Sequence, residues 1–259
     1  MIIKKSPAEI DAMARAGAIH ARCMELIARK IRPGITTGEL DAAAEKYIRS
    51  QGATPAFKGY RGFPGSICAS PNHMVVHGIP GKFKLRKGDI LSVDIGVVKD
   101  GWVADGARTF AVGEISPVAE KLLEVTEQSL FRAVEQCQVG NRLGDVSNAV
   151  QTHVEEHGFS VVRSLVGHGI GRSMHEEPQI PNYGPPGKGP VLDEGMVLAI
   201  EPMVTAGRHM VRMGDDGWSI YSQDGSLAAH FEFTIAITAA GPRILTPWHH
   251  PEAAASAAA

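Results

Sequence analysis

Cysteine is scarce in this chain of 259 residues, which holds only Cys23, Cys68 and Cys137. Three thiols are too few for a disulfide framework, and they cannot supply the four ligands of a cysteine-type zinc ribbon. A small and odd number of cysteines is typical of a reducing compartment. We therefore expect a cytoplasmic protein.

Long hydrophobic runs and an excess of one charge are also lacking. No apolar stretch approaches the roughly 20 residues that span a bilayer, and the polar amphipathic pattern after Met1–Lys5 has no apolar signal-peptide core. Lys and Arg number 26 against 28 Asp and Glu, so no global basic field attracts nucleic acid. We expect neither a membrane protein nor specificity for nucleic acid.

What is present is an ordinary globular composition, with 44% hydrophobic and 21% charged residues. This composition excludes a fibrous repeat and a chain that is disordered throughout. The length fits one large domain or two small ones. The 29 glycines and 11 histidines are the first indication of special loops and of a special site.

The two halves of the sequence repeat one pattern of helix signals. Ser6–Pro7 and Ser116–Pro117 each place a serine N-cap before a proline at the first helical position. The intervals Gly34–Gly52 and Gly140–Gly158 have equal length and carry a Gly-acid-aliphatic triplet at the same offset. The pattern predicts two helices in each half, with the halves offset by 106 residues. The helices are expected to end at about Ile31, before Gly52, at about Gln138 and before Gly158.

Strand signals follow each helix pair. Ile90–Val98 is rich in β-branched residues, Asp100–Gly101 is a hairpin turn and Trp102–Phe110 is the return strand. In the second half, Gly195–Val204 and Ala229–Thr238 are each predicted as one strand. The order predicts an α/β or α+β fold with a sheet covered by helices. We expect one domain over 1–250, with halves at about 5–112 and 113–247, and a disordered Ala-rich segment over 251–259.

Two carboxylates point the same way from the predicted hairpin. A two-residue turn at Asp100–Gly101 places Asp94 opposite Ala107, so Asp94 and Asp105 share a face of the sheet. Asp94 also lies in the otherwise apolar run Leu91–Gly96. Unpaired acids in such a setting are unfavourable, which favours a pair held by a cation over an acid that points to solvent.

The second half repeats this pattern with two glutamates. Glu201 follows the apolar run Val197–Ile200 and is offset by 107 residues from the first acid of the hairpin. Strand alternation places Glu232 on one face with His230 and Thr234. If the halves pack together, four carboxylates meet at the junction, where about two divalent cations are needed to offset their charge.

Three histidines lie in irregular segments that are rich in Gly and Pro. Glycines on both sides of His168 leave its imidazole accessible, and the segment lacks the spacing of a dinucleotide-binding fingerprint. His77 and His175 lie in similar surroundings. A lone histidine can equally be structural, so the three are candidates only.

The segment His153–His157 matches the H-x-x-E-H pattern of a zinc protease and lies on a predicted helix. The internal repeat aligns its two histidines with Tyr47 and Gln51, which are ordinary residues of the equivalent helix. We interpret the segment as a solvated helix face. A helix-borne zinc protease is the alternative, which mutation of His153 would test.

Taken together, these residues resemble type I methionine aminopeptidases. The resemblance covers about residues 4–247 and implies the "pita-bread" α/β fold, with two pseudo-symmetric halves around a dinuclear metal site in a single catalytic domain. Its motifs are Val76-His77-Gly78-Ile79-Pro80, Gly167-His168-Gly169-Ile170-Gly171, His175-Glu176-Glu177-Pro178 and Ile200-Glu201-Pro202, with the ordered set Asp94, Asp105, His168, Glu201 and Glu232.

The resemblance implies metal-dependent removal of N-terminal methionine from nascent or short peptides whose second residue is small. Two divalent ions of Co, Mn, Fe or Zn are implied. The resemblance implies that Asp94 binds one metal and that Asp105 and Glu232 bridge both. His168 and Glu201 complete the site of the other. Glu201 is the implied proton shuttle, His175 supports the oxyanion and His77 contacts the scissile amide nitrogen.

The implied side-chain pocket consists of Phe57, Tyr60, Phe63, Cys68, Met174 and Trp218. A monomer that meets nascent chains at the ribosome is the expected form.

The chain departs from the family pattern beside two of these ligands. Ala104-Asp105-Gly106 stands where many members carry Gly-Asp-Thr, and Glu232-Phe233-Thr234 stands where many carry Glu-His-Thr. Gly106 and Phe233 are neighbours of ligands rather than ligands, so the departures concern the residues that tune metal affinity, and the sequence leaves their effect open.

Two other functions share parts of this pattern. A Xaa-Pro peptidase uses the same five ligands but usually carries an added N-terminal domain. A non-enzymatic binding module on this fold loses ligands, whereas all five are present here. Cleavage of Met-Ala-Ser compared with Ala-Pro-Ala separates these alternatives.

Overall fold

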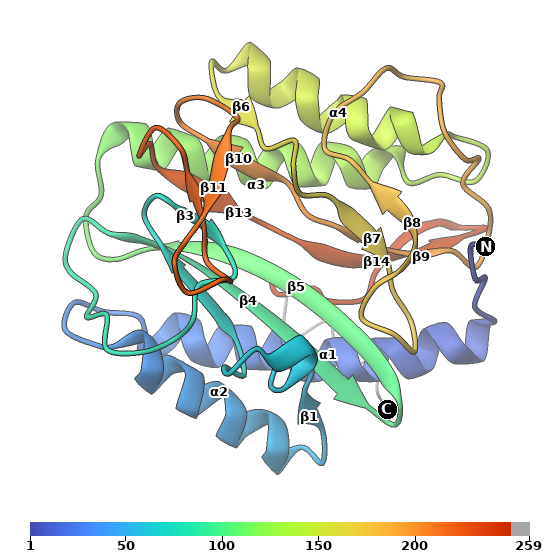
Figure 1. Ribbon diagram of the computed structural model, residues 1–259. Coiled ribbons are helices and arrows are strands. Elements are labelled where there is room, and N and C mark those ends of the chain that lie inside the picture. The colour runs from blue at the N-terminus through green and yellow to red at the C-terminus, as the bar shows by residue number, and fades with distance from the viewer. Residues whose placement is uncertain (250–259) are drawn as a thin grey trace.

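The computed structural model describes residues 1–249, and the Ala-rich segment 251–259 lies outside the described residues. Two long and two shorter helices occupy the predicted positions in the two halves (Figure 1). Small departures are confined to the helix ends, where α3 stops two residues before the expected Gln138. The helices are α1 (Pro7–Lys30), α2 (Thr37–Ser50), α3 (Pro117–Gln136) and α4 (Leu143–Glu156).

Local capping explains where these helices begin and end. The Ser6 hydroxyl accepts a hydrogen bond from the Glu9 N–H, and the Glu9 carboxylate accepts one from the Ser6 N–H, which satisfies two otherwise free donors. Thr36 and Glu39 form the same capping box on α2. After α2 and α4 the chain turns with positive φ angles, +62° at Gly52 and +82° at Gly158, a conformation that glycine adopts without strain.

Every strand pairing among the described residues is antiparallel. The first-half sheet joins β1 (Thr54–Pro55), β2 (Cys68–Pro71), β4 (Ile90–Lys99) and β5 (Trp102–Ala111). The largest second-half sheet runs β15 (Gly241–Ile244), β14 (Phe233–Thr238), β9 (Val197–Ile200), β7 (Gly167–Gly169) and β8 (Glu176–Ile180).

Two small sheets complete the fold. One contains β6 (Ser160–Val161), β10 (Met203–Thr205) and β13 (Ala228–His230). The other contains β3 (Met74–Val76), β11 (Val211–Met213) and β12 (Ile220–Ser222). The predicted mixture of helices and sheets is therefore confirmed, with the strands distributed over several sheets.

The β4–β5 hairpin has the predicted register. Asp100 and Gly101 both have positive φ, as a two-residue turn of the hairpin type requires. Asp94 pairs with Ala107, so its side chain shares a face with Asp105. The turn chemistry thus sets the positions of the first two acids.

The two long second-half strands predicted from the sequence are each broken. Gly195–Val204 divides into β9 and β10 around Glu201–Pro202, because Pro202 has no N–H to donate to a neighbouring strand. Ala229–Thr238 divides into β13 and β14, because the Glu232 N–H bonds to the Ala107 carbonyl of β5 instead. Both breaks occur at the acids that the sequence singled out.

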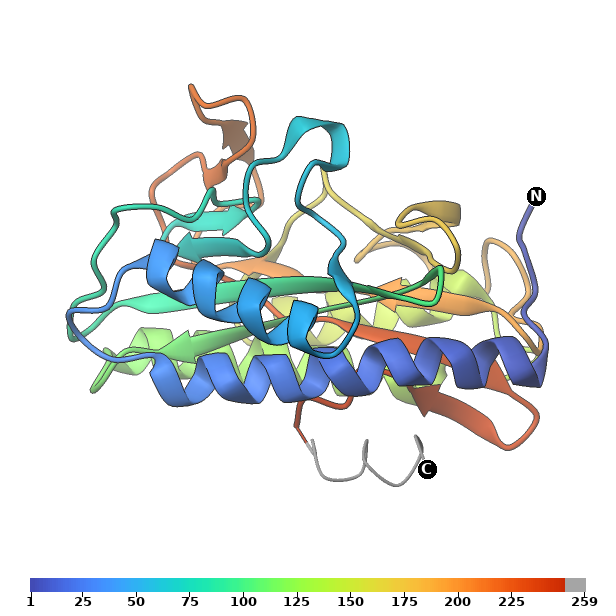
Figure 2. The same cartoon turned by 90° about the horizontal axis from the view of Figure 1, so that it is seen from below.

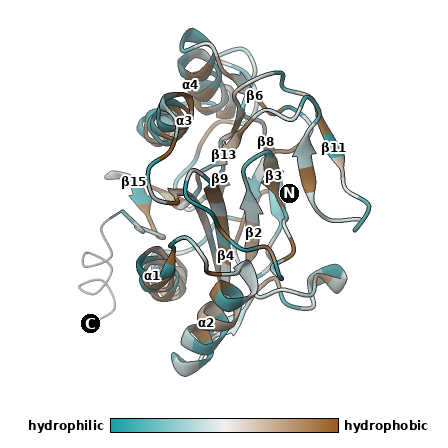
Figure 3. Cartoon of the chain, turned by 90° about the vertical axis from the view of Figure 1, so that its left-hand side faces the viewer, coloured by the Kyte–Doolittle hydropathy of each residue, from teal (hydrophilic) through white to brown (hydrophobic). Residues whose placement is uncertain are grey.

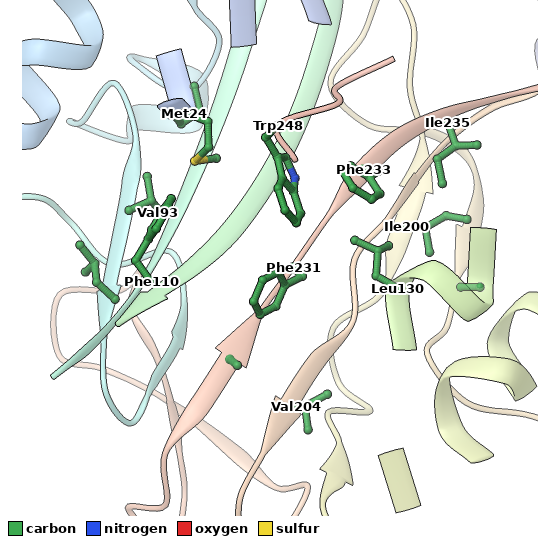
Figure 4. Close-up of a cluster of buried hydrophobic side chains, with 14 of the residues drawn as sticks. Met24, Val93, Phe110, Leu130, Ile200, Val204, Phe231, Phe233, Ile235 and Trp248 are labelled. Atoms are coloured by element: carbon green, nitrogen blue, oxygen red, sulfur yellow. The ribbon is translucent and has the colours of Figure 1, made fainter. Parts of the chain in front are cut away.

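One hydrophobic core runs through both halves. The helices lie on one side of the strands, while β3 and β11 lie on the other (Figure 3). Helix α1 packs along β4 and β5 (Figure 2). At the centre, the ring of Trp248 stacks on Phe233 at a centroid distance of 4.7 Å, near Phe231 (Figure 4).

Among residues 1–249, no helix is both long enough and apolar enough to cross a bilayer.

Candidate metal centre

The two halves are joined where β5 meets β13 and β14. Thr234 Oγ1 accepts a hydrogen bond from the Asp105 N–H at 3.0 Å and donates to the Asp105 carbonyl at 2.8 Å. The Glu232 N–H donates to the Ala107 carbonyl at 2.9 Å, and Trp248 Nε1 donates to the Glu232 carbonyl at 2.8 Å. These bonds fix the backbone on both sides of the junction and so place Asp105 and Glu232 together.

All five predicted ligands line one cavity of about 180 Å³. Ligand atoms of Asp105, His168 and Glu232 lie within 4.8 Å of one another, and all three residues are buried. Glu201 Oε1 lies 3.7 Å from His168 Nε2, and Asp94 enters from the same strand face as Asp105. The structure therefore brings the five side chains together.

The carboxyl groups of this cluster are unusually hard to ionise by themselves. Burial, followed by repulsion from neighbouring carboxylates, raises the pKa of Asp94, Glu201 and Glu232 well above the ordinary values. Burial also raises the pKa of Asp105, to about 7. A cation between these groups would remove the penalty.

The histidine of the cluster, His168, has the protonation state and the orientation that a metal ligand needs. Burial, assisted by repulsion from His175, lowers the pKa of His168 to about 4, so the ring is neutral. His168 Nδ1 lies 2.9 Å from the Gly169 carbonyl, which can only accept a hydrogen bond. Nδ1 therefore carries the proton, and the lone pair of Nε2 faces the carboxylates.

The donor set fits divalent cations. Among the described residues, Asp94 Oδ1 and Glu232 Oε1 are buried without a hydrogen-bond partner, as expected for oxygens that would bind a metal. Four carboxylates with one imidazole, and no thiolate ligand, suit Mn²⁺, Fe²⁺, Co²⁺ or Zn²⁺.

An apolar wall closes one side of the cavity. Phe63 contacts Phe57 and Trp218 in edge-to-face arrangements, with ring centroids 6.5 and 5.1 Å apart. Burial raises the pKa of the Cys68 thiol well above its ordinary value, so this residue serves as a small apolar group. The six predicted pocket residues Phe57, Tyr60, Phe63, Cys68, Met174 and Trp218 all line this cavity.

The two accessory histidines line the same cavity. The ring of His175 lies 4.3 Å from that of His168, and its Nδ1 is 2.9 Å from the Tyr60 hydroxyl. His77 has a φ of +59°, which is rare for a residue with a side chain and is typical of functional sites. Burial lowers the pKa of both histidines, which favours neutral rings.

Three residues of this region were not proposed for the site from the sequence. Arg61 lines the cavity and places its guanidinium 5.3 Å from the centre of the Tyr60 ring. His230 lies against Glu201, and His20 lies against Gly106 beside Asp105. Of the three, only His230 could have been proposed from the sequence, because strand alternation predicted that it shares a face with Glu232.

The H-x-x-E-H segment lies in a surface groove of about 440 Å³ between α3 and α4. His157 Nδ1 donates to the His153 carbonyl, and the two rings are 4.5 Å apart. The expectation of a solvated helix face was wrong for His153, which is 5% exposed because it packs inward from α4. Within residues 1–249, the group of three or more side chains that could hold a metal is Asp105, His168 and Glu232, so this segment is not favoured as a metal site.

Comparison with known proteins agrees with this geometry. A methionine aminopeptidase of Clostridium perfringens is 55% identical over 246 residues, which cover 95% of this chain and 99% of that protein. The crystal structure of a methionine aminopeptidase from Rickettsia prowazekii superposes with a TM-score of 0.94 at 40% identity, covering 95% of this chain and 100% of that one. These neighbours have the pita-bread fold that the sequence implied.

The likeness to Xaa-Pro peptidases is more distant. A prolidase from Pyrococcus furiosus gives a TM-score of 0.78 at 25% identity, and the match covers 94% of this chain but only 65% of the prolidase. Metallopeptidase family M24 matches residues 11–239. The chain therefore belongs to metallopeptidase family M24.

Proposed function

We propose that this protein is a methionine aminopeptidase that removes N-terminal methionine from peptides whose second residue is small. The observation that carries the proposal is one cavity in which a cluster of buried acids and a histidine adjoins an apolar wall. The cluster supplies the chemistry of peptide hydrolysis, and the wall suits an unbranched thioether side chain. The aminopeptidase relatives, which match nearly the whole chain, support the same activity.

Two divalent cations, when bound, polarise the scissile carbonyl and lower the pKa of the attacking water. Co²⁺, Mn²⁺, Fe²⁺ and Zn²⁺ are the candidates. The residues that would hold them are Asp94, Asp105, His168, Glu201 and Glu232.

Glu201 is proposed to move the proton. Its carboxylate lies beside His168 and reaches the cavity with 13% of the side chain exposed. From this position Glu201 can accept a proton from the attacking water and deliver it to the leaving amide nitrogen.

His175 is proposed to stabilise the oxyanion through Nε2. If the Tyr60 hydroxyl donates to His175 Nδ1 across their 2.9 Å contact, the ring proton resides on Nε2. That N–H then donates to the developing negative charge on the carbonyl oxygen. His77, on the same cavity wall, is assigned the contact to the scissile amide nitrogen.

We further propose that nascent chains are the physiological substrates and that the enzyme meets them at the ribosome as a cytoplasmic monomer. The three cysteines are free and buried, which supports a reducing compartment. The proposed unit of function is one catalytic domain over 1–250.

A peptide panel tests the function directly. The enzyme with Mn²⁺ or Co²⁺ is expected to release methionine from Met-Ala-Ser and to leave Ala-Pro-Ala intact. Chelation should abolish the activity, and the same metals should restore it. His153→Ala serves as the control for the helix-borne zinc site and should retain full activity. Release from Ala-Pro-Ala but not from Met-Ala-Ser would favour a Xaa-Pro peptidase instead.

A further inference from the structure

His230 is held firmly at the edge of the cluster, at the end of β13. Its side chain is 2% exposed. Its backbone N–H donates to Thr109 Oγ1 and its carbonyl accepts from the same hydroxyl, both at 2.9 Å. The backbone is thus tied to β5, and the ring has little freedom to turn away from the acids.

The imidazole of His230 faces two carboxylates of the cluster. Among the described residues, neither of its ring nitrogens has a hydrogen-bond partner. Nε2 lies 3.6 Å from Glu201 Oε2 and 3.8 Å from Glu232 Oε2. A buried polar group without a partner is unfavourable, and a movement of less than about 1 Å would bring Nε2 within hydrogen-bonding distance of either oxygen.

Two histidines bracket the carboxylate of Glu201, one at each oxygen. His168 Nε2 faces Oε1 at 3.7 Å, while His230 Nε2 faces Oε2 at 3.6 Å. His168 is a proposed metal ligand, so Oε1 is the oxygen placed to share its cation. Oε2 is then the oxygen available for a hydrogen bond from the other side.

We propose that His230 is a positioning residue, which donates a hydrogen bond from Nε2 to Oε2 of Glu201 and thereby directs Oε1 toward the cation shared with His168. The assignment rests on the proposed ligand set. Because four carboxylates already offset two divalent cations, a neutral N–H donor orients Glu201 without adding charge. His230 therefore contributes to metal binding without contacting the substrate.

The test compares the removal of the N–H donor with its replacement. His230→Gln keeps an N–H donor on a flexible side chain, whereas His230→Leu fills the space with an apolar group. Mn²⁺ affinity is measured by calorimetric titration of EDTA-treated protein, after circular dichroism and thermal melting confirm the fold. His230→Leu is expected to weaken Mn²⁺ binding about 10- to 100-fold and to lower kcat with little change in KM. His230→Gln is expected to retain more of the Mn²⁺ affinity than His230→Leu, because it keeps a side-chain N–H donor.

Two results would overturn the proposal. Parent-like Mn²⁺ affinity in His230→Leu would mean that the hydrogen bond does not position the ligand. Equal losses in the Gln and Leu variants would mean that the imidazole acts in another way, for example through a lone pair on the metal. His230→Ala replaces the Leu variant in both comparisons if the latter does not fold. Since metal affinity is measured without peptide, this test remains decisive even if methionine peptides are not cleaved.

Discussion

The contact between Tyr60 and His175 decides which nitrogen of His175 can act on the substrate. In the proposed assignment the Tyr60 hydroxyl donates to Nδ1 across the 2.9 Å contact, which leaves Nε2 as the N–H donor. The Tyr60 ring also lies against the imidazole, with centroids 5.6 Å apart. His175 is thus oriented by its neighbour, and it is not among the proposed metal ligands.

We predict that His175→Ala lowers kcat by roughly 10²–10³, the usual effect of losing one oxyanion donor. Its metal content should equal that of the parent protein, because the five ligands are untouched. Steady-state kinetics and elemental analysis of the purified variant measure the two quantities. Tyr60→Phe, which keeps the ring and removes the hydroxyl, should cause a smaller loss of kcat. Loss of bound metal in His175→Ala would show that its role is misassigned.

Gly106 is the residue beside Asp105 where many relatives of the implied family carry threonine, and the packing explains its identity. A Cβ atom at this position would lie 2.8 Å from Cε1 of His20 and 2.9 Å from its Nε2. His20 is fully buried on α1, and its Nε2 donates to the Gly106 carbonyl at 2.9 Å. The imidazole therefore occupies the space that a side chain at 106 would need.

This arrangement predicts strong coupling between the two positions. Gly106→Ala should destabilise the protein by about 1–3 kcal/mol through overpacking. His20→Ala should also destabilise it, because it leaves a cavity. The double variant should be less destabilised than the sum of the two single variants, by about 0.5–3 kcal/mol in a double-mutant cycle. Urea unfolding of the four proteins gives these values, and additive effects would contradict the proposed contact.

Phe233 is the other departure from that pattern, and it lies on the side away from the acids. It is fully buried, stacks on Trp248 and meets Phe131 edge-to-face with centroids 5.6 Å apart. Strand alternation turns it into the core while Glu232 faces the cavity. Within residues 1–249 the ring of Phe233 contacts Phe131, Trp248 and His249, none of which is a proposed metal ligand.

At the scale of elements, a buried ion pair ties the N-terminal segment to the strand that follows His175. Lys5 Nζ lies 2.6 Å from Oε2 of Glu176, with side-chain exposures of 3% and 8%. Glu176 Oε1 accepts hydrogen bonds from the backbone N–H groups of Arg172 and Ser173. The pair thus holds the turn that carries Met174 and His175 at the cavity.

Breaking this pair should be costly for folding and for activity. Lys5→Met leaves the Glu176 charge buried and unpaired, and we predict a loss of about 3–5 kcal/mol in unfolding free energy. kcat/KM should fall as well, because the turn that carries His175 relaxes. The matched control is Lys4→Met, which breaks an exposed pair with Asp193 and should cost no more than about 1 kcal/mol. Equal losses in both variants, measured by urea unfolding, would contradict this role of the pair.

The elements that could be predicted are those determined by local chemistry. Capping residues and Ser-Pro pairs determine where α1 and α3 begin, and Asp100–Gly101 determines the hairpin register. The break at Glu232 could not be predicted, because it depends on the bond between its N–H and the Ala107 carbonyl of the other half. The break after Glu201 had a local signal in Pro202, which the prediction of one continuous strand overlooked. The contact of His20 with Gly106 spans 86 positions and left no periodic signal.

The ligand residues were found by residue type and by resemblance, whereas their supports depend on tertiary structure. Arg61 lies over the Tyr60 ring and His230 lies beside Glu201, and such contacts exist only once the chain has folded. The sequence thus identifies the groups that perform the chemistry more readily than the groups that hold them.

At the scale of the whole molecule, the cluster lies across the junction of the halves. Asp94 and Asp105 come from the first half, and His168, Glu201 and Glu232 come from the second. A cation bound there would link the halves in addition to the bonds between β5 and β14. Metal binding should therefore stabilise the fold by mass action as well as enable the chemistry.

The pKa shifts give this stabilisation a definite dependence on pH. Asp105, with a folded pKa of about 7, and the other three acids have pKa values raised above those of the unfolded chain. The stability they contribute in metal-free protein is present at low pH and is lost as pH rises through the folded pKa values. Burial lowers the pKa of His20 and of His168 to about 4 in the folded protein. The stability that these two neutral rings contribute is therefore lost as pH falls from about 6.5 to 4. The two sets of groups oppose each other between about pH 4 and 6.5, whereas above about pH 6.5 the acids alone lower the stability of metal-free protein.

We predict that the increase in melting temperature caused by Mn²⁺ is larger at pH 7.5 than at pH 6. Binding must displace protons from the acids, so Mn²⁺ affinity rises with pH and protons are released. Thermal melts with EDTA or Mn²⁺ at both pH values measure the first effect. Calorimetry in two buffers with different ionisation enthalpies counts the released protons. The variant Asp105→Asn, which removes a proposed bridging carboxylate, should bind Mn²⁺ weakly and release fewer protons. An increase in melting temperature that is the same at both pH values, with no proton release, would mean that the acids are already ionised before the metal binds.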